Sequence, residues 1–165
     1  MNTETSPAHF SLNPTPLKQL GMLNPLSRQA LELYDAHGLS TQDRLFFCLW
    51  NNNQLSAGIF RPGDKLSVKG EQMSSAHVVV SGDMQASDGQ KNFTLGPGSV
   101  IGLAEGMANL PCQFTVTATS TVNTRIIPID KAQRELMRSN AGLRGICRSA
   151  IARTLSLREI PENLK

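Results

Sequence analysis

The sequence predicts a mainly β fold with flanking helices: an antiparallel β-roll, or double-stranded jelly roll, with N-terminal helices and a C-terminal helix pair. Two observations carry this prediction. Between residues 58 and 129, short β-prone runs alternate with turns that contain glycine, a pattern typical of an antiparallel roll. On both sides of this stretch, apolar residues recur at helical spacing. The 165 residues are enough for one domain with a substantial core.

The N-terminal part divides into a tail and two helices. Residues 1–16 hold three prolines and no hydrophobic period, so we expect a flexible tail followed by one domain over residues 17–165. Apolar residues at helical spacing, ended by Gly38, predict a first helix over 26–37. A new start signal then predicts a second helix over 41–51, and the two together span 26–51.

The β-roll is expected over residues 58–129. Turn signals such as Pro62-Gly63-Asp64, Ser81-Gly82-Asp83 and Asp88-Gly89 separate its strands. The predicted strands are residues 59–60, 66–68, 76–80, 84–86, 93–95, 114–119 and 122–129.

Helical spacing returns after the roll, over residues 130–159. It predicts one helix near 130–138 and a longer one from Asn140, which would be its N-cap, to about Glu159 before Pro161. A further short helical run is expected over 103–108, inside the β-rich region.

Two glycines flank the start of that short run. Gly98 and Gly102 can adopt positive φ and let main-chain N–H groups approach an anion closely, as in phosphate-binding loops. Tight turns in a β-roll would use the same glycines. For Gly98 the turn is at least as good an interpretation, whereas Gly102 opens the helical run and favours the anion cradle.

Specific residues add a family resemblance to this pattern. Leu95-Gly96-Pro97-Gly98, then Ile101-Gly102 and Leu110-Pro111-Cys112-Gln113, resemble the phosphate-binding cassette of the cyclic nucleotide-binding domain. That domain is found in catabolite activator proteins, kinase regulatory subunits and cyclic-nucleotide-gated channels. The preceding order of Pro62-Gly63-Asp64, Gly70-Glu71 and Val78-Val79-Val80-Ser81-Gly82 is similar to the early strands of the family. The resemblance covers residues 20–158 and implies the catabolite-activator-like β-roll. It places the ligand-binding cassette positions at Gly102, Leu103, Ala104, Cys112 and Gln113.

Two of these positions depart from the family, which makes the cassette degenerate. The resemblance implies a glutamate for the ribose at Leu103 and an arginine for the cyclic phosphate at Cys112. Losing one member of a buried charged pair costs about 2 to 5 kcal/mol, and an unpaired hydroxyl about 1 to 3 kcal/mol more. Gln113 and the main-chain amides of Gly102 and Ala104 remain as donors.

Two neighbouring side chains have alternative interpretations. Phe114 stands where the family usually has alanine, so its ring either fills the ligand pocket or packs in the core as an ordinary strand aromatic. Glu105 either reaches back toward the position of the missing glutamate or faces solvent from the helix.

These observations predict a cyclic nucleotide-binding-like regulatory or protein-interaction module that does not bind cAMP or cGMP in the usual way. The alternative is a small-molecule sensor that binds a cyclic nucleotide or another ligand in the cassette pocket through main-chain contacts. We expect no enzymatic activity and no cofactor, because no catalytic spacing is present. We also expect no metal site, because His9, His37 and His77 are isolated along the chain.

The last predicted helix carries a stripe that suggests a partner. In the family this helix commonly forms a dimer interface, and its apolar residues have the 4-3-4-3 spacing of a short coiled coil. A homodimer or another protein partner is therefore expected, while packing of the stripe against the chain's own roll is the equal alternative. The stripe consists of Leu143, Cys147, Ala150, Thr154 and Leu157.

We expect neither DNA nor membrane binding. Only eight residues follow Leu157, so the C-terminal DNA-binding domain of the transcription-factor branch is expected to be absent. Residues 134–165 hold seven basic and three acidic side chains, which solvated helix flanks explain. No apolar run has membrane-spanning length. Three scattered cysteines indicate free thiols in a reducing compartment, and we expect a cytoplasmic protein.

Overall fold

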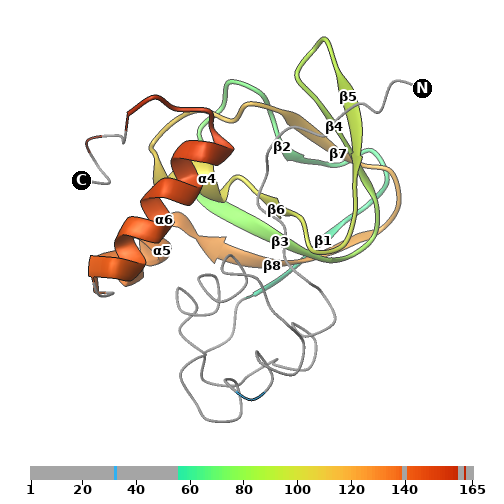
Figure 1. Ribbon diagram of the computed structural model, residues 1–165. Helices are drawn as coiled ribbons and strands as arrows, with labels where there is room; N and C mark the ends of the chain where they lie inside the picture. The colour runs from blue at the N-terminus through green and yellow to red at the C-terminus, as the bar shows by residue number, and fades with distance from the viewer. Residues whose placement is uncertain (1–31, 33–55, 139–140, 160–161, 163–165) are drawn as a thin grey trace.

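The computed structural model describes residues 32, 56–138, 141–159 and 162 (Figure 1). The predicted tail, the helices over 26–37 and 41–51, and the Asn140 N-cap lie outside the described residues.

Eight strands form the roll that the sequence predicts, in two four-stranded sheets. One sheet has the order β1-β8-β3-β6 and the other β2-β7-β4-β5, and every strand pairing is antiparallel. The fold class is therefore confirmed. The strands are β1 (Ala57–Phe60), β2 (Lys65–Ser67), β3 (Ser75–Ser81), β4 (Met84–Ser87), β5 (Asn92–Leu95), β6 (Val100–Ile101), β7 (Thr115–Ala118) and β8 (Val122–Pro128).

Within residues 56–138 and 141–159, three helices gather at one end of the roll, opposite the β4–β5 hairpin (Figure 1). They are α4 (Leu103–Met107), α5 (Ile129–Arg138) and α6 (Ala141–Thr154). The two C-terminal helices match the predicted pair, but α6 ends about five residues before the expected Glu159.

A Schellman motif explains this early end. Ser156 has φ 54, its N–H donates to the Arg153 carbonyl, and the Leu157 N–H donates to the Ala152 carbonyl at 2.8 Å. Glycine usually takes the left-handed position of this motif, so a serine there gave no stop signal in the sequence.

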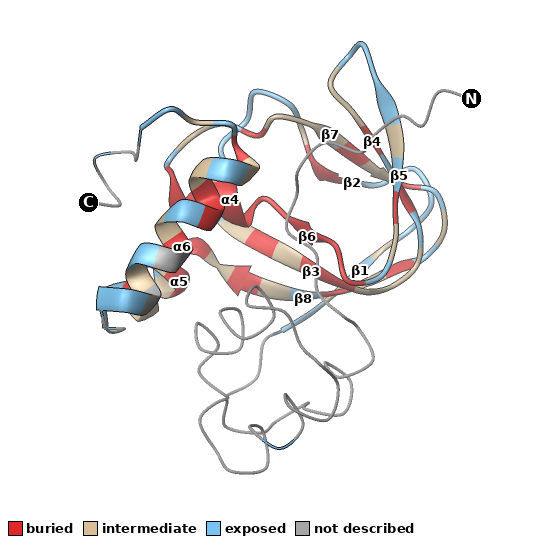
Figure 2. Ribbon diagram, in the orientation of Figure 1, coloured by how far each residue is buried: buried red, intermediate tan, exposed pale blue. Residues whose placement is uncertain are grey.

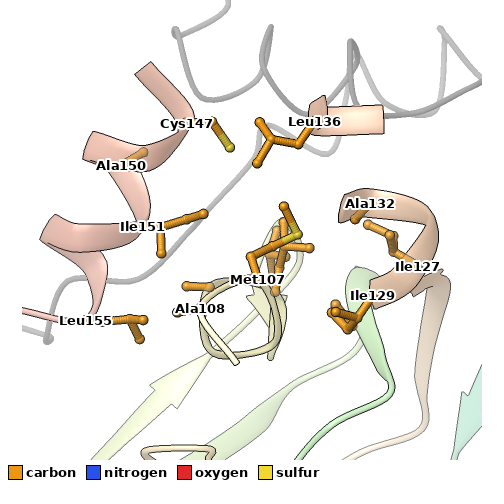
Figure 3. Packing of buried hydrophobic residues seen from close by; sticks show 14 of the residues in the cluster. Met107, Ala108, Ile127, Ile129, Ala132, Leu136, Cys147, Ala150, Ile151 and Leu155 are labelled. Atoms are coloured by element: carbon orange, nitrogen blue, oxygen red, sulfur yellow. The ribbon is translucent and has the colours of Figure 1, made fainter. Parts of the chain in front are cut away.

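The buried residues form two clusters, and burial alternates along the strands (Figure 2). The first, the helical core, joins the three helices to one end of the roll. In Figure 3, side chains of α6 point toward Met107 and Ala108 and toward the residues of α5 and β8. The second, the roll core, fills the space between the sheets and includes Leu66, Val79, Met84, Ile101, Val116 and Val122.

Candidate functional site

The predicted cassette runs from β5 through β6 into α4. Gly98 has φ 92 and donates its N–H to the Val79 carbonyl at 2.8 Å, so it is a turn residue fastened to β3. Gly102 has φ 83 and immediately precedes α4. A Cβ at Gly102 would collide with Sδ of Met73 and lie 2.9 Å from its Cε, so Met73 closely covers this turn.

α4 is a short helix with two different faces. Leu103 and Met107, one turn apart, are 3% and 0% exposed and pack in the helical core. The helix ends in another Schellman motif, in which Asn109 has φ 56 and the Leu110 N–H donates to the Glu105 carbonyl at 2.9 Å. Because Leu103 points into the core, Glu105 lies on the opposite side of the helix.

Main-chain hydrogen bonds fix the segment after α4. Cys112 exchanges two of them with the β2–β3 connection: the Gly70 N–H donates to the Cys112 carbonyl at 2.8 Å, and the Cys112 N–H donates to the Glu71 carbonyl at 2.9 Å. Next along the chain, Gln113 Nε2 donates to the Leu155 carbonyl at 3.4 Å. This bond connects the cassette to the end of α6.

A cavity of about 50 Å³ lies beside the cassette. One water needs roughly 10 to 15 Å³ of such a cavity, so there is room for a few water molecules. Pockets that hold drug-sized ligands measure roughly 300 to 1,000 Å³. The cavity is lined by Ser67, Ala86, Phe93, Leu95, Val100, Ile101, Gly102, Ala104, Glu105, Cys112, Gln113, Phe114, Val116 and Thr154.

The ionisable groups of the lining are Glu105 and Cys112. Burial and, to a smaller extent, the carboxylates of Glu105 and Glu71 together raise the pKa of the Cys112 thiol to about 11. Burial also raises the pKa of Glu105, while hydrogen bonding from the main-chain N–H groups of Glu105 itself and of Gln113 acts in the opposite direction. No lysine, arginine or histidine is found among the described residues that line the cavity. The Cys112 thiol is therefore neutral at neutral pH, and Glu105 is the acidic side chain of the lining.

Phe114 combines both interpretations that the sequence allowed. Its ring lines the cavity, and it also packs edge-to-face with Phe93, with ring centroids 5.1 Å apart and an angle of 88° between the planes. Ser67 Oγ donates to the Phe114 carbonyl at 2.9 Å and holds the start of β7 against β2.

Four of the five expected cassette positions meet at the cavity, namely Gly102, Ala104, Cys112 and Gln113. Leu103 differs, because its side chain is buried in the helical core and does not line the cavity. Of the two interpretations of Glu105, the solvent-facing one is wrong, because the residue is half-buried and lines the cavity. The helical period could have predicted this, since residues two apart on a helix lie on opposite sides and Leu103 and Glu105 therefore face different surroundings.

The stripe proposed for a dimer packs largely within the chain. Cys147 and Ala150 are each 2% exposed in the helical core, and Leu157 packs against the same cluster. Thr154 lines the cavity. The side chain of Leu143 lies outside the described part of the chain. This arrangement is the alternative in which the stripe packs against the roll, and the dimer stays a prediction.

Solved structures share this arrangement of strands and helices. The EAL enzyme Bd1971 in its cAMP-bound form matches with a TM-score of 0.53 and 14% identity over 61% of this chain and 29% of that enzyme. cAMP-bound PfPKA-R matches with a TM-score of 0.51 and 15% identity over 92% of this chain and 48% of that chain. The chain has the fold of a cyclic nucleotide-binding domain.

A third structure supports the same fold. It comes from a cyclic-GMP-dependent signalling pathway that regulates bacterial phytopathogenesis, and matches with a TM-score of 0.51 and 19% identity over 62% of this chain and 86% of that one. No protein-family model matches the sequence. No curated protein sequence matches it either. The cyclic nucleotide-binding fold is thus established by structure.

None of the helices described here is long and apolar enough to cross a membrane.

Proposed function

We propose that the protein is a cyclic nucleotide-binding-like regulatory or protein-interaction module whose cassette does not take cAMP or cGMP in the usual way. The observation that carries this proposal is the lining of the cassette cavity. The resemblance expects an arginine at position 112, and the structure has there a buried thiol with a pKa of about 11.

The charge of this lining disfavours a cyclic phosphate. An arginine would give the phosphate two parallel charge-assisted hydrogen bonds, whereas a neutral thiol is a weak donor with no charge. Two like charges about 4 Å apart repel by about 4 kcal/mol at the dielectric typical of a protein surface. A phosphate in this cavity would meet the Glu105 carboxylate with no cation among the described lining residues to offset it.

The small size of the cavity also disfavours binding of a cyclic nucleotide. At about 50 Å³ it is several times smaller than pockets that enclose a drug-sized ligand. The wall of the cavity includes the rings of Phe93 and Phe114, which pack against each other and leave little room for a purine inside it.

Calorimetric titration of the purified protein with cAMP and with cGMP tests the proposal. We expect no saturable heat up to millimolar ligand. Saturable binding of either nucleotide at low micromolar concentration would contradict the proposal directly.

The remaining cavity supports a second candidate, a sensor of a ligand much smaller than a nucleotide. The lining joins an apolar wall to the polar groups of Gln113, Glu105 and Thr154. A thermal-shift screen of neutral and cationic compounds of a few heavy atoms tests this candidate. A stabilising compound should lose its effect in Val116→Trp, which fills the cavity from β7, and should keep it in the control Ser149→Ala on the exposed side of α6.

A regulatory module of this kind acts through another protein or a second copy, without catalysis. Light scattering of the wild type and of Leu143→Asp tests the homodimer. A dimeric wild type that becomes monomeric on substitution supports the homodimer. A monomeric wild type contradicts the homodimer, and a different protein then remains as the partner.

A further inference from the structure

Glu105 is an unusual residue for the wall of a cavity. It is half-buried, it stands between the buried residues Ala104 and Gly106 of α4, and burial raises the pKa of its carboxyl. Burial disfavours the ionised form of such a carboxyl group, and hydrogen-bond donors nearby favour it.

The compensating donors belong to the cassette itself. The main-chain N–H groups of Glu105 itself and of Gln113 lower the pKa of the Glu105 carboxyl, against the effect of burial. The Gln113 side chain is directed elsewhere, to the Leu155 carbonyl. Glu105 and Gln113 line the same cavity, so the main-chain N–H of Gln113 acts on an acid from within the chain.

Glu105 lines the cavity together with Cys112, and its charge raises the pKa of the Cys112 thiol. Cys112 holds the position that the resemblance gives to the phosphate-binding arginine. Glu105 thus shares the cavity wall with two neighbouring residues, Cys112 and Gln113, that an anion in the cassette would contact.

We propose that the Glu105 carboxylate occupies the anion position of the cassette, as an internal substitute for the phosphate of a ligand, and that it excludes external anions. This inference rests on the proposed function and names the residue that determines it. Carboxylate and phosphate oxygens accept hydrogen bonds from the same main-chain donors, so an entering anion has to displace Glu105 and be repelled by it.

The local fold makes this occupation a fixed feature. Gly102 with φ 83 sets where α4 begins, and Leu103 and Met107 fix its rotation by packing in the helical core. With this rotation, position 103 points away from the cavity and position 105 points toward it. Leu103→Glu alone would therefore place its acid in the core.

The test measures the affinity for cAMP and for inorganic phosphate in two variants, Cys112→Arg and Cys112→Arg with Glu105→Ala. We expect the double variant to bind cAMP at least tenfold more tightly, because the added guanidinium is released from Glu105. The matched control is Cys112→Arg with Glu71→Ala. Glu71 is exposed, also raises the pKa of Cys112 and does not line the cavity. Adding Glu71→Ala to Cys112→Arg should change the affinity for cAMP less than threefold.

Equal affinities in the first two variants, or binding in neither, would overturn the inference. An equal gain from Glu71→Ala would overturn it too, since the effect would then be one of overall charge. Thermal unfolding of each variant checks that it folds. Binding of cAMP by the wild type at low micromolar concentration would remove the proposed function, while the ratio between the variants would still decide the role of Glu105.

A second measurement needs no ligand and only the isosteric Glu105→Gln. Titration of Cys112 followed by the NMR shift of its Cβ should show a lower thiol pKa in Glu105→Gln than in the wild type. The amide proton of Gln113 should shift upfield as it loses a charged acceptor. If neither signal moves, the carboxylate does not lie at this position and the inference fails.

Discussion

Gly102→Ala should destabilise the protein more than Gly70→Ala, because Met73 covers the turn at Gly102. Gly102 has φ 83, a conformation that costs an alanine about 1 to 2 kcal/mol. The new Cβ would also collide with Sδ of Met73. Met73 is half-buried and the clash is with the flexible end of its side chain, so the overpacking cost should be at the low end, about 1 kcal/mol, and we expect a total loss of about 2 to 3 kcal/mol.

Gly70→Ala is the matched control. Gly70 has φ 88, but a Cβ there would meet nothing within 4 Å. Its loss should be only the backbone strain of about 1 to 2 kcal/mol. The difference between the two variants isolates the contact with Met73.

Urea denaturation followed by far-UV circular dichroism measures both losses, with unchanged slopes as evidence that the unfolded states are alike. In a Met73→Ala background, the excess loss from Gly102→Ala should disappear. The reasoning is refuted if the two glycine variants differ by less than about 0.5 kcal/mol, the usual limit of additivity, or if the excess persists without Met73.

Three further outcomes follow from buried groups. Ile151→Ala, at a side chain 1% exposed in the helical core, should cost about 2 to 5 kcal/mol in the same denaturation assay, whereas the exposed Ser149→Ala should stay within about 0.5 kcal/mol. Burial lowers the pKa of His77, so the unfolded chain binds more protons there, and stability should fall as pH drops below about 6.5. His77→Gln should flatten this part of the pH profile, and an unchanged profile would show that another group causes it. Cys112 and Cys147, each with a pKa raised from 9.0 to about 11, have about a hundredfold smaller thiolate fraction than an ordinary thiol. Peptide mass spectrometry after alkylation at pH 7 should find both unmodified until the protein unfolds, and fast labelling of either would contradict its burial.

The β-roll was predictable because its turns depend on local chemistry. In Ser81-Gly82-Asp83, for example, the predicted turn has Gly82 at φ 98, where a Cβ would lie 2.8 Å from Cα of Val122. A residue without a side chain is needed there, and the sequence shows it. β6 was missed because a strand of only two residues, Val100 and Ile101, carries no period of its own.

The orientation of α4 was not predictable in the same way. The family pattern directed attention to Leu103, and only packing against α5 and α6 decides that Leu103 faces the core and Glu105 the cavity. The end of α6 was missed for a related reason. Ser156 takes a left-handed conformation that Leu157 supports by packing against the helical core, and this contact is tertiary.

β6 belongs to two structural neighbourhoods at once. Val100 packs with the helices in the helical core, while Ile101 is buried between the sheets in the roll core. The next residue along the chain is Gly102, which precedes the cavity wall of α4. The peptide unit between Val100 and Ile101 therefore joins the two buried clusters directly, and a substitution at either residue changes the packing of one cluster next to an anchor of the other.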